Sequence, residues 1–251
     1  MFHALSAAGF DIATRNHAQA ILAGDFADEV AGLVNALLLF RIPARELIRS
    51  GGGQAASTMR LRDALYAKGW TKHEFVVQTI VDGIEREATS HEVDHVKRCP
   101  NGTLALEIEW NNKDPFFDRD LENFQRLHGQ GAISLGVLVT RGAAMQSALT
   151  QVVASTIRSE GIGEASELRA WGMKERTERQ MKMLADLMEK QVPFADAFAQ
   201  SFVADKFGAA TTHWSKLENR IRRGVGNPCP LLLIGLPLSS VADYSAASPE
   251  L

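Results

Sequence analysis

The stretch SHEVDHVKRCPNGTLALEIEW, residues 90–110, decides the fold. The chain from Ile84 to Lys97 reads as one strand and Thr103 to Trp110 as the next, and Asn101-Gly102 is a tight turn between them. Strands joined by so short a connection are adjacent and antiparallel. We therefore expect a β-hairpin here.

Three carboxylates lie on this predicted hairpin, Asp94 on the first strand and Glu107 and Glu109 on the second. Glu107 and Glu109 share a face because side chains alternate along a strand, while apolar residues fill the alternate positions. Crowded carboxylates repel one another, and a hard cation such as Mg²⁺ offsets that repulsion. The pattern favours a metal site suited to phosphodiester hydrolysis. The alternative is a solvated acidic strand edge.

The flanking sequence predicts an α/β protein. Asp82-Gly83 indicates a second hairpin, Asp25 is a candidate N-cap and Gly69 a helix stop. Periodicity predicts strands at 75–81, 133–140 and 230–236, and helices at 25–40, 58–68, 118–128, 143–160, 174–190, 194–206 and 213–223. We expect a single domain, 1–251, with a core at about 70–160, helical additions at 11–69 and 174–225, and a loose tail from Ser239.

Composition narrows the class of protein. The formal net charge is -3 and 45% of residues are hydrophobic, which fits a globular protein and argues against a simple basic DNA-binding module. Two isolated cysteines form no disulfide framework or zinc site. Neither a signal peptide nor a membrane span is evident, so we expect a soluble cytoplasmic protein with no membrane partner.

Asp94 followed by Glu107-x-Glu109 resembles the PD-(D/E)xK nuclease motif, and the order hairpin, strand, helix, strand fits that superfamily. More closely, residues 90–97 and EIEWNNKDPFFDRD, residues 107–120, resemble type II restriction endonucleases of the BglII/BstYI group. The likeness spans about His17 to Leu236. It implies a restriction-endonuclease-like core, in which helices flank a mixed central β-sheet.

The resemblance also implies roles for individual residues. Asp94 and Glu107 would bind Mg²⁺ with the Ile108 carbonyl, and Glu109 stands where the usual pattern has Lys, which leaves two roles open: general base or helper in metal binding. DNA contacts would come from residues after two strands: Asn111, Asn112, Lys113, Thr140 and Arg141. Asn suits adenine and Arg suits guanine in the major groove. Taken alone, Asn111-Asn112 and Arg141-Gly142 equally fit ordinary turns.

Three further features have a functional and a plain interpretation. Lys216, Arg220 and Arg223 share a helix face that either contacts DNA phosphates or is simply solvated. The glycine-rich segment 51–54, with Arg60 and Arg62 after it, either approaches the DNA backbone or is a flexible loop. His91 and His95 flank Asp94, and we expect them at a strand edge or near DNA.

The expected function is therefore Mg²⁺-dependent cleavage of double-stranded DNA at a short palindromic site, by a homodimer that leaves 5′-phosphate ends. The group resemblance suggests a GATC-centred site and a cognate DNA methyltransferase in the same cell. The alternatives are a PD-(D/E)xK repair or structure-specific nuclease without sequence specificity, and an inactive DNA-binding protein.

Overall fold

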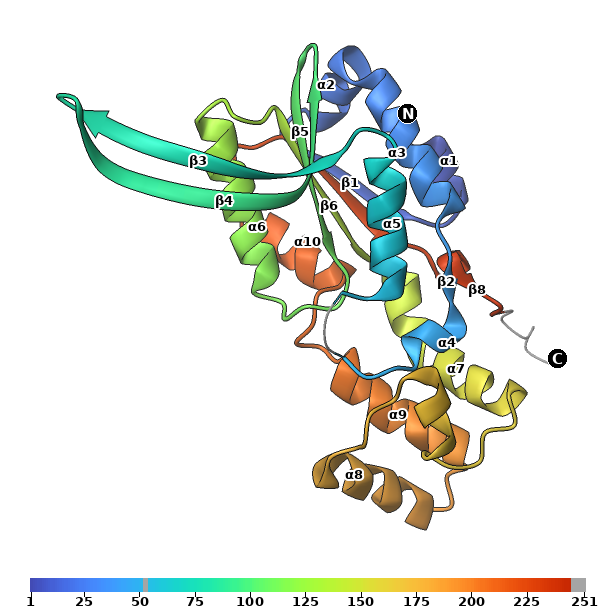
Figure 1. Ribbon diagram of the computed structural model, residues 1–251. Helices are drawn as coiled ribbons and strands as arrows, with labels where there is room; N and C mark the ends of the chain where they lie inside the picture. The colour runs from blue at the N-terminus through green and yellow to red at the C-terminus, as the bar shows by residue number, and fades with distance from the viewer. Residues whose placement is uncertain (52–53, 245–251) are drawn as a thin grey trace.

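The computed structural model describes residues 1–51 and 54–244 as a mixed six-stranded sheet flanked by helices, which confirms the predicted fold class (Figure 1). The strands are β1 (Asp11–Arg15), β3 (Thr71–Val81), β4 (Ile84–Cys99), β5 (Gly102–Glu109), β6 (Leu135–Arg141) and β7 (Leu231–Leu236). The helices are α1 (His3–Ala7), α2 (Ala18–Asp25), α3 (Ala27–Leu39), α4 (Ala44–Leu47), α5 (Ala56–Tyr66), α6 (Phe116–Gly129), α7 (Ala143–Ser159), α8 (Glu178–Glu189), α9 (Phe194–Lys206) and α10 (Trp214–Arg222).

The sheet order is β1-β7-β6-β5-β4-β3. Strand β5 pairs antiparallel with β4 and parallel with β6, so it joins the two halves of the sheet. Strands β6 and β7 are buried along their whole length, as their continuous apolar sequence predicts. The hairpin and the strand after it thus lie where the sequence places them.

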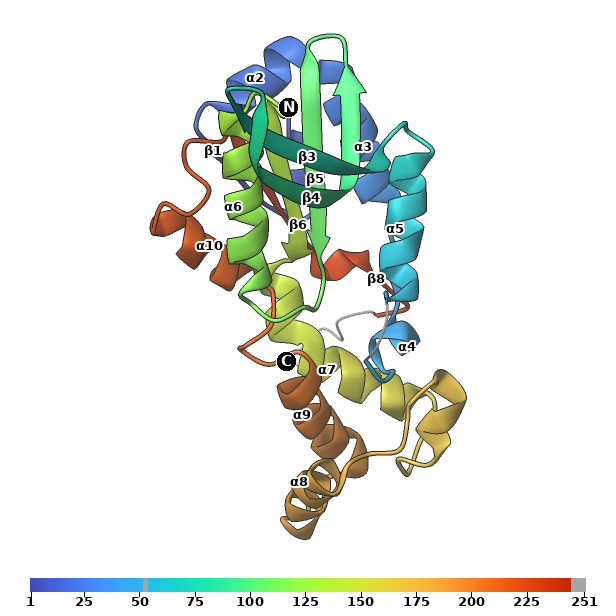
Figure 2. The same cartoon turned by 60° about the vertical axis from the view of Figure 1, so that its left-hand side comes forward.

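Each face of the sheet has its own core. On one face, Leu104 and Leu106 of β5 belong to a cluster with buried residues of α3, α5 and α7. On the other face, Ala105 packs with Phe117, Leu121 and Phe124 of α6 and with α10. Figure 2 shows α6 and α10 on one side of the sheet and α5 on the other. Alternate residues of β5 therefore face different layers, and Glu107 and Glu109 face α6.

Strands β3 and β4 form a two-stranded ribbon that projects beyond the rest of the molecule (Figure 1). At its tip Asp82 and Gly83 both have positive φ, which fits the expected tight hairpin turn and explains this residue pair. The outer part of the ribbon is exposed on both faces, including Val76, Ile80 and Ile84.

The structure corrects several local expectations. Asp25 ends α2, and α3 has Phe26 as its N-cap with no side-chain hydrogen bond, so the expected Asp25 cap is wrong. Residues 11–15, within a segment expected to add helices, form β1 beside β7. The start of the expected loose tail is ordered: 3-10 helix η2 (Leu238–Ser240) leads into β8 (Val241–Ala242), which pairs with β2 (Ile42–Pro43). A second 3-10 helix, η1 (Glu167–Trp171), precedes α8. Part of the glycine-rich segment, residues 52–53, and the tail from 245 lie outside the described residues.

Within the described ranges, no helix combines the length and the apolar character that a membrane crossing requires.

Gly136 of β6 determines how closely α6 approaches the sheet. A Cβ atom placed there would lie 2.4 Å from Cδ2 of Phe124, so only glycine permits this packing. We expect Gly136→Ala to lower the free energy of unfolding by about 1–3 kcal/mol through overpacking. Urea denaturation measures the change. Gly24→Ala is the control: an added Cβ at Gly24 meets nothing within 4 Å, and alanine favours the helix there. Equal stability changes in the two variants would contradict this view of the packing.

Candidate active site

Asp94 and Glu107 lie opposite each other on neighbouring strands. The β4–β5 register pairs His95 with Leu106, and Asp94 and Glu107 are the next residues outward. The backbone N–H of Asp94 donates to Oε1 of Glu107 at 3.3 Å. Glu107 is buried, whereas Asp94 is exposed and lines a cleft. The structure thus brings together the first two candidate metal ligands.

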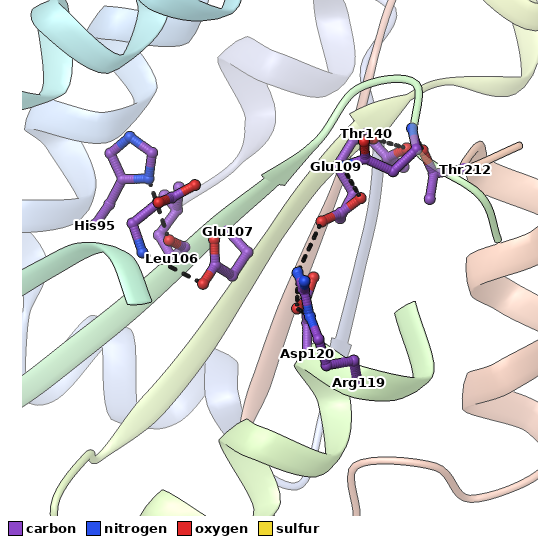
Figure 3. Close-up of polar contacts among 10 residues, drawn as sticks. His95, Leu106, Glu107, Glu109, Arg119, Asp120, Thr140 and Thr212 are labelled. Carbon is purple, nitrogen blue, oxygen red and sulfur yellow. Dashed lines mark hydrogen bonds and ion pairs between the residues drawn. The ribbon is translucent and has the colours of Figure 1, made fainter. Parts of the chain in front are cut away.

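Glu109 is buried against α6 and contacts two residues there. Figure 3 shows Glu109 facing Arg119 and Asp120 across the space between β5 and α6. The Nη2 of Arg119 lies 3.5 Å from Oε1 of Glu109. Asp120 is 2% exposed, and its Oδ1 accepts from Nε and Nη2 of Arg119 at 2.8 and 2.7 Å. A fourth carboxyl group therefore joins the three that the sequence analysis identified.

Burial and crowding raise the pKa values of this group. The pKa of Glu107 is raised well above its usual range, first by burial and then by the charges of Asp120 and Asp94. Burial and the adjacent Asp120 raise the pKa of Glu109 to about 8. Burial also raises the pKa of Asp120. A hydrogen bond between the carboxyl groups of Glu109 and Asp120 requires a proton on one of them.

The donor atoms here suit a hard cation. Carboxylate and backbone carbonyl oxygens are the ligands that Mg²⁺ prefers, and the mutual repulsion of the carboxyl groups is what a cation would relieve. In their present positions, no three Asp, Glu, His or Cys side chains of the described residues are close enough together to hold a metal ion.

A cleft of about 690 Å³ opens beside Asp94. Ile108, Trp110, Asn111 and Asn112 line it from the end of β5. Three cations line it from elsewhere in the chain: Arg49, Lys174 and Lys206. Burial is the largest of the effects that lower the pKa of Lys206 to about 8. The cleft is thus a polar space that adjoins one of the candidate metal ligands.

The segment after β5 is held by hydrogen bonds within the protein. The Asn112 amide donates to Oε2 of Glu109 at 2.8 Å. The Asn111 amide donates to the Lys206 carbonyl, and its oxygen accepts from Arg141. Lys113, which is exposed, forms an isolated bridge with Thr211. Asn112 and Lys113 are therefore open to solvent, whereas both ends of the Asn111 amide are already occupied.

Thr140 and Arg141 are fully buried at the end of β6. The hydroxyl of Thr140 donates to the backbone carbonyl of Glu109 at 2.8 Å. The guanidinium of Arg141 donates to Asn111, Thr211 and Thr212, and burial lowers its pKa to about 9. In this conformation neither side chain reaches the surface where Asn112 lies. Arg141 instead links the ends of β5 and β6 to the start of α10.

The basic face of α10 is largely neutralised. Lys216 and Arg220 both form ion pairs with Asp114, and Arg220 also pairs with Asp118 at the start of α6. Arg220 is buried, whereas Arg223 is exposed. Two of the three candidate phosphate contacts therefore hold α10 against the segment that begins α6.

The expected placement of His95 at a strand edge is wrong. Its ring is fully buried, with Nδ1 3.2 Å from the Leu106 carbonyl oxygen and the Tyr66 ring 5.7 Å away. Burial lowers the pKa of His95, so its environment favours the neutral ring. His91, four residues before His95 on β4, is only partly covered.

Arg119 and Asp120 are the members of the site to which the sequence analysis assigned no role. The signal for Asp120 is nevertheless present. Phe117, Leu121 and Phe124 form the apolar stripe of α6, and position 120 lies within it at spacings of three and four residues. A carboxylate on an otherwise apolar face requires a partner, which here is the Glu109–Arg119 pair.

A family model described as restriction endonuclease BglII/BglIII matches residues 10–236 of the chain. The search of curated proteins found no match to the chain.

The raised pKa of Glu109 predicts a pH-dependent stability in metal-free buffer. Its folded-state pKa of about 8 exceeds the ordinary 4.5, so the stability it contributes is complete below pH 4.5 and is lost as the pH rises through 8. Glutamine cannot ionise, so we expect Glu109→Gln to unfold near the wild-type temperature at pH 5 but several degrees above it at pH 9, since each kcal/mol corresponds to roughly 2–4 °C in a chain of this size.

Thermal unfolding in EDTA measures this difference. Glu122→Gln, on the exposed side of α6, is the matched control and should show no such divergence. A Glu109→Gln curve parallel to that of the wild type at all pH values would mean that Glu109 is ionised in the folded protein near its ordinary pKa.

Proposed function

The chain belongs to the BglII/BglIII family of restriction endonucleases, and from this premise we propose that it is a type II enzyme that cuts both strands of a short palindromic DNA site. Family membership makes it a nuclease acting on DNA. The observation that supports the finer proposal is the pairing of Asp94 with Glu107, with Glu109 on the same face of β5.

We propose Mg²⁺ as the cofactor, held by the carboxylates of Asp94 and Glu107 and by the Ile108 carbonyl. When bound, the ion lowers the pKa of a water and offsets charge on a phosphate oxygen. Asp94 is the accessible ligand, because it lines the cleft, whereas Glu107 is buried. A bound cation would offset the mutual repulsion of the carboxyl groups that raises the pKa values of Glu107 and Glu109.

Glu109 is proposed as the residue that orients or deprotonates the attacking water. Its two oxygens contact Arg119 and Asn112, so its position is defined from two sides. Removal of the proton from Glu109 precedes either role, because a protonated carboxyl group is a poor acceptor. Asn112 is proposed to read a base edge, and its bond to Glu109 would then connect base recognition with the catalytic strand.

The cleft beside Asp94 is proposed as the path of the DNA. Asn112 and Lys113 are open to solvent, and Arg49, Lys174 and Lys206 supply positive charge for phosphates. Arg223, which is exposed directly after α10, is proposed as a phosphate contact. Lys216 and Arg220 would act by fixing α10, and Asn111, Thr140 and Arg141 by fixing the ends of β5 and β6.

Cleavage of a palindrome requires a reader with two-fold symmetry, so we propose a homodimer. A cell that makes such an enzyme must protect its own DNA, which calls for a cognate DNA methyltransferase. We propose that both act in the cytoplasm, where the DNA is. A GATC-centred site remains a suggestion from the group resemblance.

Digestion of plasmid DNA by the purified protein with Mg²⁺ tests this function. We expect discrete fragments with 5′-phosphate ends, and sequencing the ends gives the site and the cut position. A smear, or cutting only at branched structures, would favour a nuclease without sequence specificity. Binding to DNA without cleavage by any divalent ion would favour an inactive DNA-binding protein.

Glu107→Ala should reduce the cleavage rate by roughly 10³-fold or more, since loss of a metal ligand removes several kcal/mol of transition-state stabilisation. Glu122→Ala, on the exposed side of α6, should cleave like the wild type. DNA affinity in Ca²⁺ and thermal unfolding of both variants show whether they still bind and fold. Cleavage by Glu107→Ala at the wild-type rate would exclude Glu107 as a catalytic ligand.

A further inference from the structure

Arg119 supplies a positive charge where the motif strand has none. The usual pattern places Lys two residues after the metal-binding Glu, but Glu109 occupies that position here. We propose that Arg119 is a catalytic residue that contacts the scissile phosphate and replaces the charge of the absent Lys. This inference rests on the proposed function and adds a residue from α6 to the active site.

Arg119 is the cation next to the candidate catalytic carboxylates. Among the described residues, it is the only Lys or Arg that forms an ion pair with Asp94, Glu107 or Glu109. Its Nη2 lies 3.5 Å from Oε1 of Glu109. The cations Arg49, Lys174 and Lys206 line the adjacent cleft but form no such pair.

Exposure separates Arg119 from its partners. The Arg119 side chain is 53% exposed, whereas those of Glu109 and Asp120 are 4% and 2% exposed. A phosphate that approaches Glu109 from solvent therefore meets the guanidinium. Arg141, at the end of the neighbouring strand β6, is by contrast fully buried and held by neutral acceptors.

Two contacts hold the guanidinium in this place. Asp120 accepts from Nε and Nη2, and the Phe116 ring lies 4.4 Å from the guanidinium carbon. Asp120 is thus a positioning residue: it is anchored in the core of α6 and fixes Arg119 through one oxygen. Arg119, held by Asp120, thus provides from helix α6 the positive charge that a Lys on strand β5 would otherwise provide.

The chemistry requires no proton from Arg119. A water oxygen forms the new bond to phosphorus and loses a proton to Glu109 or to solvent, the bond from phosphorus to the 3′ oxygen breaks, and that oxygen takes a proton from solvent. Negative charge builds on the phosphate oxygens as this occurs. A guanidinium is suited to stabilising that charge because it stays protonated and presents planar donors.

The test compares Arg119→Ala and Arg119→Lys with Arg126→Ala, an exposed arginine two turns further along α6 whose side chain bonds to Asn123. Single-turnover cleavage is measured on a plasmid fragment that the wild type cuts, at saturating Mg²⁺. Affinity for the same fragment is measured without Mg²⁺, and folding by thermal unfolding. We expect Arg119→Ala to lower the rate by about 10²–10³-fold, with affinity changed less than about tenfold, a partial recovery in Arg119→Lys, and wild-type behaviour in Arg126→Ala.

Two further measurements separate catalysis from structure. Methylguanidinium added to Arg119→Ala should restore part of the rate, which a misfolded site would not allow. Asp120→Asn, which keeps the volume of the side chain, should also slow cleavage and should not respond to methylguanidinium, because Arg119 is still present.

Three results would overturn the inference. The first is a cleavage rate in Arg119→Ala equal to that of the wild type at every Mg²⁺ concentration. The second is a wild-type maximal rate that Arg119→Ala reaches at a lower Mg²⁺ concentration, which would mean that Arg119 only neutralises the carboxylates. The third is a loss of DNA affinity that accounts for the whole fall in rate. In each case cleavage by the wild type would leave the proposed function standing. A wild-type protein that cleaves no DNA would overturn both.

Discussion

The site depends on one electrostatic constraint, the cost of keeping four carboxyl groups close together at the edge of an apolar layer. Glu107, Glu109 and Asp120 are buried, and Asp94 lies opposite Glu107 on the neighbouring strand. Ionisation of all four without a cation is unfavourable, and the raised pKa values of the three buried groups express that cost. Three features of the protein reduce this cost: the guanidinium of Arg119, the amide donor of Asn112 and the protons that the raised pKa values retain on the buried carboxyl groups. A divalent cation would reduce the repulsion further. The arrangement is therefore costly without a cation but suited to binding one.

Much of this arrangement could be predicted from the sequence, because it rests on local rules. The tight turn, expected at Asn101-Gly102 and found one residue earlier at Pro100-Asn101, and the alternation of Leu104, Leu106 and Ile108 are enough to put Glu107 and Glu109 on one face and Asp94 on the neighbouring strand. What could not be predicted depends on contacts between distant segments. Strand β1 is too short and too polar to stand out, and it exists because β7 offers it an edge. His95 sits where a strand-edge residue was expected, but α5 covers it.

The roles of charged residues were the hardest feature to predict from the sequence. Lys216 and Arg220 form a basic helix face in isolation, yet both pair with acids that precede or begin α6. Arg141 has the chemistry of a base-reading residue, but its donors are used to join three chain segments. Arg119 has no special pattern around it. Its significance follows only from the packing of α6 on the sheet, where Phe124 lies against Gly136 of β6 and Arg119 reaches Glu109 of β5. A run of cations in a sequence therefore gives the charges but not the partners that determine what they can do.

The connection between β4 and β5 makes chain length a functional variable. Asp94 lies opposite Glu107 because only Pro100 and Asn101 connect the paired residues Cys99 and Gly102. One inserted residue would set Asp94 against Leu106 or Ile108, whose side chains point to the other face of the sheet, so the carboxyl groups would separate although neither had been mutated. The Asp82-Gly83 tip has no such influence, since it lies at the far end of the ribbon. Insertions and deletions should thus be excluded at the turn between β4 and β5 but accommodated at the turn between β3 and β4.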